Sequence, residues 1–352
     1  MADQARIETV CLHGGHTPDG ASPSRAVPIY QTTSYVFRDA GHASRLFDLQ
    51  EAGHLYTRIS NPTTGVLEAR MAMLEGGAAA LAVASGQAAA TLAFLTLCDS
   101  GDEIVASSKI YGGTFNLLGT TLARLGITTR FVGSPEPSRV RGAISPKTKA
   151  VFVEAIGNPS GDVADLPALA QVAHGRGVPL VVDATTATPV LCRPIEHGAD
   201  IVIHSATKFI GGHGTSIGGI LVDSGRFPWD NGRFPRMTEP SEGYHGLRFW
   251  EAFREPGGKN LAFIARARAE LLRDLGPALS PFNAFLLLQG LETLPLRMER
   301  HCANAMAVAR WLAGHPGVAW VSYPGLGDHP SHGAARKLLS GGYGAMLTFG
   351  AK

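Results

Sequence analysis

A single lysine, Lys208, lies in the segment IVIHSATKFIGGHG, between small hydroxylated residues and a run of glycines. The apolar, β-branched run before it, residues 201–203, predicts a buried strand, so Lys208 would follow the exit of that strand. The glycines after it let another group approach the backbone closely. A lysine in such a place can act as a nucleophile toward a carbonyl compound, or it can simply extend from a strand end into water.

Two further segments offer groups that this chemistry could use. In VASGQAA a predicted strand gives way to a predicted helix at Ser85, Gly86 and Gln87, and the N–H groups at the start of a helix suit a phosphate. Asp183 ends the apolar strand PLVVD, where it can serve a turn or cap a helix as readily as a reaction. Neither segment identifies a function by itself.

The three segments together match the requirements of pyridoxal phosphate. This cofactor needs a lysine for its Schiff base, an acid opposite its pyridine nitrogen, and a cradle for its phosphate. Lys208 and Asp183 supply the first two, and the turn at Ser85, Gly86 and Gln87 supplies the third. Their joint occurrence favours Lys208 as a cofactor-binding lysine over a lysine that only meets water.

A rival motif overlaps the same region. GTSIG, residues 214–218, matches the G-x-S-x-G pattern of serine hydrolases, with Ser216 as the candidate nucleophile. That pattern requires a strand before the serine and a helix after it, whereas here a glycine turn precedes Ser216 and the strand-like GILVDSG follows. A hydrolase is therefore a distant alternative.

Other cofactor and metal sites lack their sequence fingerprints. Neither G-x-G-x-x-G nor G-x-x-x-x-G-K-[ST] occurs, so nicotinamide and P-loop nucleotide sites are not indicated. His204 and His213 flank Lys208 without other ligand types at suitable spacing, and we expect them to be pocket or turn residues. We expect no metal.

The elements that must position these residues follow one pattern. From residue 77 onward, near-continuous apolar runs alternate with helix-like runs, which predicts an α/β fold with a mainly parallel sheet covered by helices. Ligands bind such sheets at the carboxyl ends of the strands. Residues 226–258 have no sustained period and are rich in aromatics, which predicts an ordered lid or interface.

We predict three parts along the chain. Residues 1–62 lack the alternation and are predicted to form an arm. Residues 63–294 would form the large domain, and residues 295–352 a smaller α+β domain. The boundary is placed near Pro295, which should kink a long helix.

Composition limits the partners. The 352-residue chain has a net charge of +2 and no basic or acidic block, which argues against a nucleic-acid partner. The N-terminal segment lacks the apolar core of a secretory signal, and no later run reaches membrane-spanning length, so we expect a cytoplasmic protein without a membrane partner. The four scattered cysteines predict buried or incidental thiols.

Along essentially the whole chain, the sequence resembles the Cys/Met-metabolism enzymes of pyridoxal-phosphate fold type I. HSATKFIGGHGTSIGG is similar to the lysine signature of that family, YTRISNPTT to its arm motif, and ASGQAA to its phosphate turn. The resemblance implies pyridoxal 5'-phosphate as the cofactor, fold type I, and a homo-oligomer in which a dimer completes each site and a tetramer is expected.

The resemblance also implies roles for individual residues. Lys208 would be the Schiff base and proton shuttle, Asp183 would face the pyridine nitrogen, and Tyr111 would stack on the ring. Asn158 of IGNP would bond the phenolic oxygen, with a turn role as the alternative. The phosphate would be held by the turn at Ser85, Gly86 and Gln87 and by the hydroxyls of Ser205 and Thr207 before the lysine. A neighbouring subunit would add Tyr56 and Arg58. A turn is also the alternative for Tyr56.

Within the family, the segments around Lys208 and LGPALSPFNAFLLLQGLETLPLRMERH are most similar to the O-acetylhomoserine sulfhydrylase branch. That branch implies γ-replacement on O-acetyl-L-homoserine by sulfide or a thiol, giving L-homocysteine or methionine and acetate. The alternatives are a γ- or β-lyase or cystathionine γ-synthase of the same family, which use the same residues, and a non-catalytic truncated relative.

The last expectation concerns the carboxyl-terminal end. Family members continue well past a strand such as GAMLTFG, and the arginine that holds the substrate carboxylate would come later. On that basis we expect an incomplete small domain, an exposed apolar edge near residues 346–349, lowered solubility, and little or no turnover despite intact cofactor chemistry.

Overall fold

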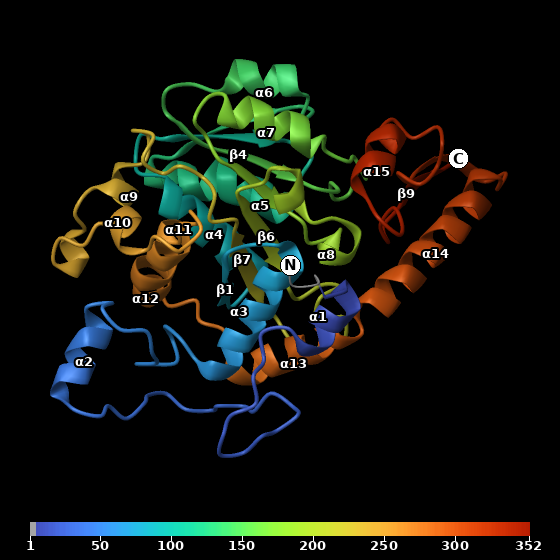
Figure 1. Ribbon diagram of the computed structural model, residues 1–352. Coiled ribbons are helices and arrows are strands. Elements are labelled where there is room, and N and C mark those ends of the chain that lie inside the picture. The colour runs from blue at the N-terminus through green and yellow to red at the C-terminus, as the bar shows by residue number, and fades with distance from the viewer. Residues whose placement is uncertain (1–4) are drawn as a thin grey trace. The chain divides into compact units, whose positions relative to one another are not determined.

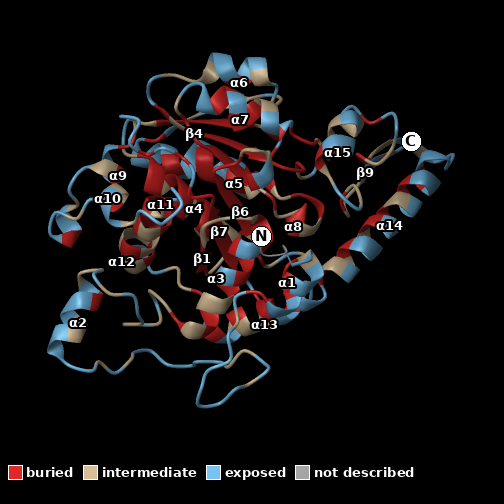
Figure 2. Cartoon of the chain, viewed as in Figure 1, coloured by how far each residue is buried: buried red, intermediate tan, exposed pale blue. Residues whose placement is uncertain are grey.

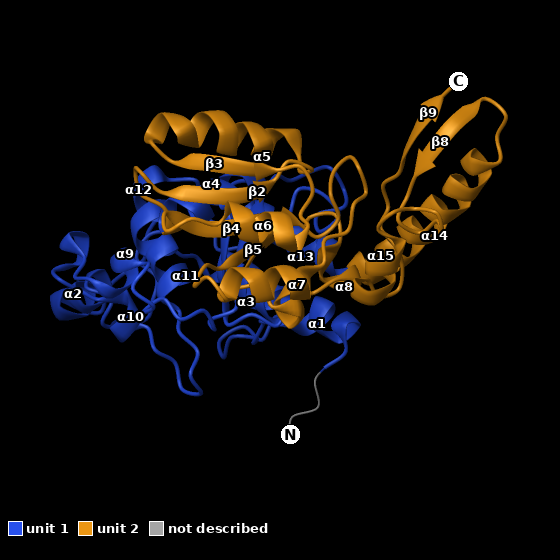
Figure 3. Cartoon of the chain, turned by 90° about the horizontal axis from the view of Figure 1, so that it is seen from above, with its two compact units in different colours: residues 1–96, 205–292 blue, residues 97–204, 293–352 orange. Residues whose placement is uncertain are grey.

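The computed structural model of the protein describes residues 5–352, and the chain falls into two compact units (Figure 3). Unit 1 holds the described residues up to Thr96 together with Ser205–Glu292, and unit 2 holds Leu97–His204 and Thr293–Lys352. Residues 1–4 of the predicted arm lie outside the described part. The units follow other boundaries than the three predicted parts, which stay a prediction.

Unit 2 is built on a parallel sheet, as the alternation of apolar and helical runs predicts. The strands follow one another across the sheet as β3 (Thr128–Val132), β2 (Glu103–Ser107), β4 (Thr148–Glu154), β5 (Leu180–Asp183) and β6 (Ile201–Ser205). The four strands from β2 to β6 are almost wholly buried (Figure 2), because helices cover both faces of such a sheet. Because β4, β5 and β6 are parallel, their carboxyl ends lie at the same edge of the sheet.

Short helices connect these strands (Figure 1). The α7 helix begins at an N-cap, Asp165, whose carboxylate accepts from the N–H of Ala168. The connecting helices are α5 (Gly112–Asn116), η1 (Leu117–Thr121), η2 (Leu122–Leu125), α6 (Pro137–Ala143), α7 (Leu166–His174), α8 (Thr188–Leu191) and η3 (Pro194–His197).

Unit 1 contains an antiparallel pair, β1 (Ala79–Val83) and β7 (Gly219–Asp223). The buried guanidinium of Arg70 donates to the carbonyls of Cys11 and Gly14, which ties the N-terminal α1 to α3. Beyond this tie, α2 and the segments beside it are largely exposed (Figure 2). The main helices are α1 (Ile7–His13), α2 (Ala40–Phe47), α3 (Pro62–Glu75), α4 (Gly86–Leu97), α11 (Ala262–Arg266), η5 (Ala267–Leu272), α12 (Arg273–Leu275) and α13 (Pro281–Glu292).

The aromatic segment 226–258 is ordered, but its large rings serve the core of unit 1. It carries the short helices α9 (Pro235–Thr238), η4 (Glu242–Tyr244) and α10 (Phe249–Ala252). Trp229 is 1% exposed and packs edge-on against Phe234 and face-on against Phe263 of α11, with ring centroids 5.0 and 5.7 Å apart. Trp229 therefore anchors the aromatic segment to the core of unit 1.

The last part of unit 2 consists of α14 (Leu294–Ala313), β8 (Val318–Ser322), α15 (His332–Leu338) and β9 (Thr348–Ala351). Pro295 lies in the first turn of α14, two residues after the N-cap Thr293, so the predicted kink is a helix boundary. β9 pairs with β8, and Trp320 and Phe349 of this ribbon are 55% and 50% exposed. Of residues 346–349, where an apolar edge is expected, only Phe349 is exposed.

Three further properties bear on the predicted site. All four cysteines are buried thiols that form no disulfide. Among the described residues, no helix is both long and apolar enough to cross a membrane. Within the same residues, no three His, Cys, Asp or Glu side chains gather where they could hold a metal ion.

Truncating the tryptophan that anchors the aromatic segment should destabilise the protein. We expect Trp229→Ala to lower the free energy of unfolding by about 3–5 kcal/mol, the usual cost of emptying a buried aromatic site. The exposed Trp320→Ala is the matched control and should cost less than about 1 kcal/mol. Urea unfolding followed by circular dichroism measures both, and equal losses would contradict a core role for Trp229.

Candidate functional site

Lys208 lies in a turn that begins where β6 ends. The turn is closed by backbone hydrogen bonds from the N–H of Gly211 to the carbonyl of Ala206 and from the N–H of Gly212 to the carbonyl of Lys208. Lys208 itself is exposed. The glycines thus let the chain fold tightly behind the lysine and leave its amine accessible, as the sequence predicts.

The start of α4 packs against the residue that ends β6. A Cβ placed on Gly86 would lie 2.5 Å from Cβ, 2.8 Å from Cα and 2.9 Å from Oγ of Ser205, so only a glycine fits there. Ser85 begins the helix as an N-cap, and its Oγ accepts from the N–H of Ala88 at 3.1 Å. The contact brings Ser85, Gly86, Gln87 and Ser205 together within unit 1.

Thr207 joins the lysine turn to the approach of β7. Its Oγ1 accepts from the N–H of Gly218 at 3.1 Å and lies 3.2 Å from the carbonyl of the same residue, to which it can donate. The hydroxyl proton can thus be directed either to this carbonyl or to an anion. Thr207 has a structural role, and a phosphate contact would need only a rotation about its C–O bond.

Tyr56 and Arg58 lie together in a different segment of unit 1. The guanidinium of Arg58 lies 5.1 Å from the centroid of the Tyr56 ring, and both residues are exposed. The carbonyl of Tyr56 accepts turn hydrogen bonds from the N–H groups of Ile59 and Ser60. The pair therefore presents a cation and a hydroxyl to the outside of unit 1.

In unit 2, Asp183 ends β5 at the carboxyl edge of the sheet. Its Oδ1 accepts from the N–H of Thr185 at 2.8 Å, so it serves a turn as well. Burial raises the pKa of the Asp183 carboxyl, while hydrogen bonds from Thr185 and the nearby His204 oppose the shift. A cation placed against this carboxylate would favour its ionised form.

A buried acid that the sequence does not single out, Glu154, connects Tyr111 with Asn158. Its Oε1 accepts from the N–H of Tyr111 at 2.6 Å, and its Oε2 accepts from the N–H of Asn158 at 2.8 Å. Tyr111 is 50% exposed, so its ring remains available for stacking. The parallel register also places Glu154 beside Asp183. Unit 2 thus brings Tyr111, Asn158 and Asp183 around one edge.

The motif around Ser216 does not form the hydrolase elbow. Residues 214–218 are irregular, and β7 rather than a helix follows. Ser216 is 8% exposed, and its Oγ lies 3.5 Å from the carbonyl of Asn283. The structure therefore gives no support to the hydrolase alternative.

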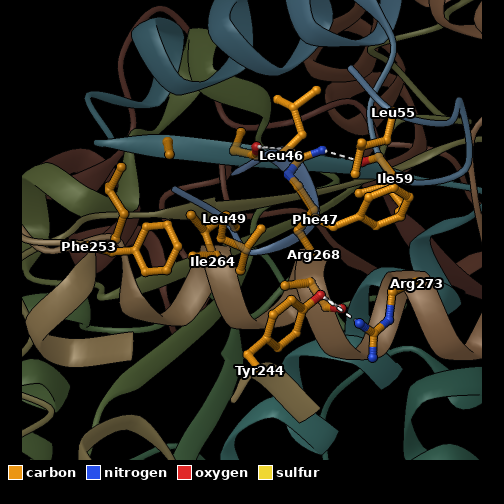
Figure 4. Close-up of a pocket in the computed structure, with 15 residues that line it drawn as sticks. Leu46, Phe47, Leu49, Leu55, Ile59, Tyr244, Phe253, Ile264, Arg268 and Arg273 are labelled. Carbon is orange, nitrogen blue, oxygen red and sulfur yellow. Dashed lines mark hydrogen bonds between the residues drawn. The ribbon is translucent and has the colours of Figure 1, made fainter. Parts of the chain in front are cut away.

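A separate apolar pocket in unit 1 is not foreseen by the sequence (Figure 4). It has a volume of about 420 Å³ and includes none of the predicted site residues. Figure 4 shows Tyr244 and Arg273 on one side of it, where Arg273 donates to the Tyr244 hydroxyl at 2.8 Å. Its apolar lining includes Leu46, Phe47, Leu49, Leu55, Phe253 and Ile264.

The residues fit the two ends of pyridoxal phosphate, each within its own unit. Unit 1 presents an accessible amine, a helix start and a hydroxyl packed against it, which suits an aldehyde and a phosphate. Unit 2 presents an acid, a half-exposed aromatic ring and an asparagine, which suits a pyridine ring.

The chain is similar to several known proteins. The chain is 57% identical over 353 residues to an O-acetyl-L-homoserine sulfhydrylase of Leptospira meyeri, covering 99% of this chain and 80% of that protein. It is 56% identical to a homocysteine synthase of Schizosaccharomyces pombe, covering 99% of this chain and 81% of that protein. A Campylobacter jejuni crystal structure with N'-pyridoxyl-lysine-5'-monophosphate has a TM-score of 0.94 and 39% identity, covering 99% of this chain and 86% of that one.

These similarities extend to a whole family. The sequence matches the family described as Cys/Met metabolism PLP-dependent enzyme over residues 8–352. The α/β fold with its mainly parallel sheet and the pyridoxal-phosphate cofactor are therefore confirmed. With a lysine turn, a phosphate-suited helix start and an acid at a strand end, the chain belongs to the Cys/Met metabolism family of PLP-dependent enzymes.

Proposed function

We propose that the protein catalyses γ-replacement on O-acetyl-L-homoserine with sulfide or a thiol, giving L-homocysteine or methionine and acetate. The observation that carries the proposal is that relatives 53–57% identical over nearly the whole chain are named for O-acetylhomoserine sulfhydrylase or homocysteine synthase. The site agrees with it, since an accessible lysine and a phosphate-suited turn lie within one unit.

The cofactor would be held at its two ends. Lys208 would form the covalent link, while the N–H groups of Gly86 and Gln87 would bind the phosphate together with the hydroxyls of Ser205 and Thr207. Ser85 would shape this turn as the N-cap of α4. When bound, pyridoxal phosphate withdraws electrons from the substrate carbon that loses its proton.

Residues of unit 2 would set the electronic state and position of the ring. Asp183 would keep the pyridine nitrogen protonated, since an ionised carboxylate stabilises a neighbouring cation. Tyr111 would cover one face of the ring, and Asn158 would bond the phenolic oxygen. The amine of Lys208 would carry the α-proton of the substrate. Lys208 would thus be a catalytic residue together with Asp183 and Tyr111, which would contact the cofactor ring.

We propose a homo-oligomer in which a dimer completes each site, with a tetramer as the expected assembly. Tyr56 and Arg58 support it, because their exposed hydroxyl and guanidinium are suited to a phosphate outside their own unit. We also propose that the enzyme is located in the cytoplasm. The small-molecule partners would be the amino-acid substrate and sulfide.

The identity of the product tests the proposed reaction. We expect the purified protein with pyridoxal phosphate to convert O-acetylhomoserine to homocysteine and acetate only when sulfide is present. The same mixture with Lys208→Ala is the control and should give no product, because the variant lacks the amine that moves the proton. Formation of 2-oxobutyrate without sulfide would identify a γ-lyase instead and would contradict the proposal.

The contact between α4 and Ser205 predicts a loss of cofactor affinity in Gly86→Ala. The added methyl group would collide with the backbone and side chain of Ser205, which separates the helix start from the hydroxyl. We expect the Kd for pyridoxal phosphate to rise about tenfold to a hundredfold, the effect of losing a charge-assisted hydrogen bond.

The matched control for this variant is Gly65→Ala in α3. A Cβ at Gly65 meets no atom within 4 Å, and alanine is the better helix former, so cofactor affinity should not change. Absorbance titration of the apo-proteins measures Kd, and circular dichroism verifies folding. A folded Gly86→Ala protein with the affinity of the natural one would refute the phosphate role of this turn.

A further inference from the structure

Glu154 holds two segments that are distant in the chain at the carboxyl edge of the sheet in unit 2. Tyr111 precedes Glu154 by 43 residues and opens α5, and Asn158 follows it by four. One carboxylate oxygen accepts from each backbone N–H, at 2.6 and 2.8 Å. Because a carboxylate is a rigid planar group, these two bonds fix the backbone of Tyr111 relative to that of Asn158.

The surroundings make Glu154 an unfavourable place for a charge. The side chain is 7% exposed, and within the described part of the chain no lysine or arginine forms an ion pair with it. Burial and the neighbouring Asp183 carboxylate both raise the pKa of Glu154, while the two N–H donors oppose the shift. Only the ionised form accepts at both oxygens without turning a proton toward a donor.

Another buried acid of the same unit shows the contrast. Glu103, at the opposite end of the sheet, accepts from the guanidinium of Arg130 at 2.8 and 3.0 Å and from the Ser145 hydroxyl. These hydrogen bonds and the ion pair lower the pKa of Glu103. Glu103 is thus a compensated structural acid, whereas the Glu154 carboxylate accepts, among residues 5–352, from the backbone of two predicted cofactor residues and from no cationic side chain.

We propose that Glu154 is a positioning residue for the cofactor ring, which sets the Tyr111 ring and the Asn158 amide in one fixed geometry. The inference rests on the proposed function for the roles of Tyr111 and Asn158. A shift of either backbone segment would move a side chain against the ring by a comparable amount, and small misplacements of positioning groups cost much in rate. A protonated pyridine nitrogen beside Asp183 would also favour the ionised form of Glu154.

The first test uses Glu154→Gln without cofactor. Glutamine keeps the shape but turns an NH₂ group toward one of the two backbone donors, so one N–H loses its acceptor. We expect amide hydrogen exchange to become about tenfold faster in peptides that cover Tyr111 or Asn158, as measured by mass spectrometry. Glu103→Gln, the same change in a buried acid of the same unit, should leave both peptides unchanged. Unchanged exchange in Glu154→Gln would overturn the proposal.

The second test measures the visible circular dichroism of the bound cofactor, which depends on a fixed asymmetric setting of the ring. Per bound cofactor, we expect Glu154→Gln to lose half or more of the signal, while Glu103→Gln keeps it even if its thermal stability falls. A purely structural role for Glu154 would lower stability and leave this signal intact, which would overturn the proposal.

The natural protein separates failure of this proposal from failure of the proposed function. If it binds pyridoxal phosphate with a visible signal that Lys208→Ala removes, but Glu154→Gln leaves the signal unchanged, only the positioning role is wrong. If the natural protein shows no lysine-dependent signal at all, the cofactor assignment of Lys208 fails and the positioning role fails with it.

Discussion

The predicted cofactor site depends on how closely the start of α4 approaches the end of β6. At Gly86 the distance is so short that even a methyl group would overlap Ser205. This contact places helix N–H groups and a hydroxyl side by side, and Lys208 follows Ser205 by three residues along the chain. Any residue with a Cβ at position 86 would overlap Ser205, so only glycine fits there. Backbone packing, rather than flexible side chains, therefore sets the geometry of the predicted anion site.

The parallel sheet of unit 2 imposes a second constraint. Parallel strands deliver the last residue of each strand to the same edge, which is why Glu154 and Asp183 are neighbours in register although 29 positions of sequence separate their numbers. Two buried acids side by side oppose each other's ionisation. A cationic ring nitrogen beside these two carboxylates would relieve their repulsion. The strand ends are also the edge at which α/β sheets of this kind bind their ligands.

Much of this could be predicted from the sequence, because the strands are continuous apolar runs and the site residues follow them. Lys208, Asp183 and the Gly86 turn all lie where a strand-to-turn transition predicts them. Glu154 could not be found this way, since a glutamate at a strand end carries no special pattern and one of its partners is a backbone N–H 43 residues earlier. The aromatics of segment 226–258 were likewise ambiguous, because burial of Trp229 depends on Phe263 in a later helix.

The covalent role of Lys208 is the central claim, and reduction of the cofactor-loaded protein with borohydride tests it most directly. Borohydride makes a lysine-bound pyridoxyl group permanent, so proteolysis and mass spectrometry can locate it. The account predicts one phosphopyridoxyl group per chain, on the peptide that contains Lys208. A group found instead on Lys109, Lys149 or another lysine, or the absence of any stable modification, would contradict it.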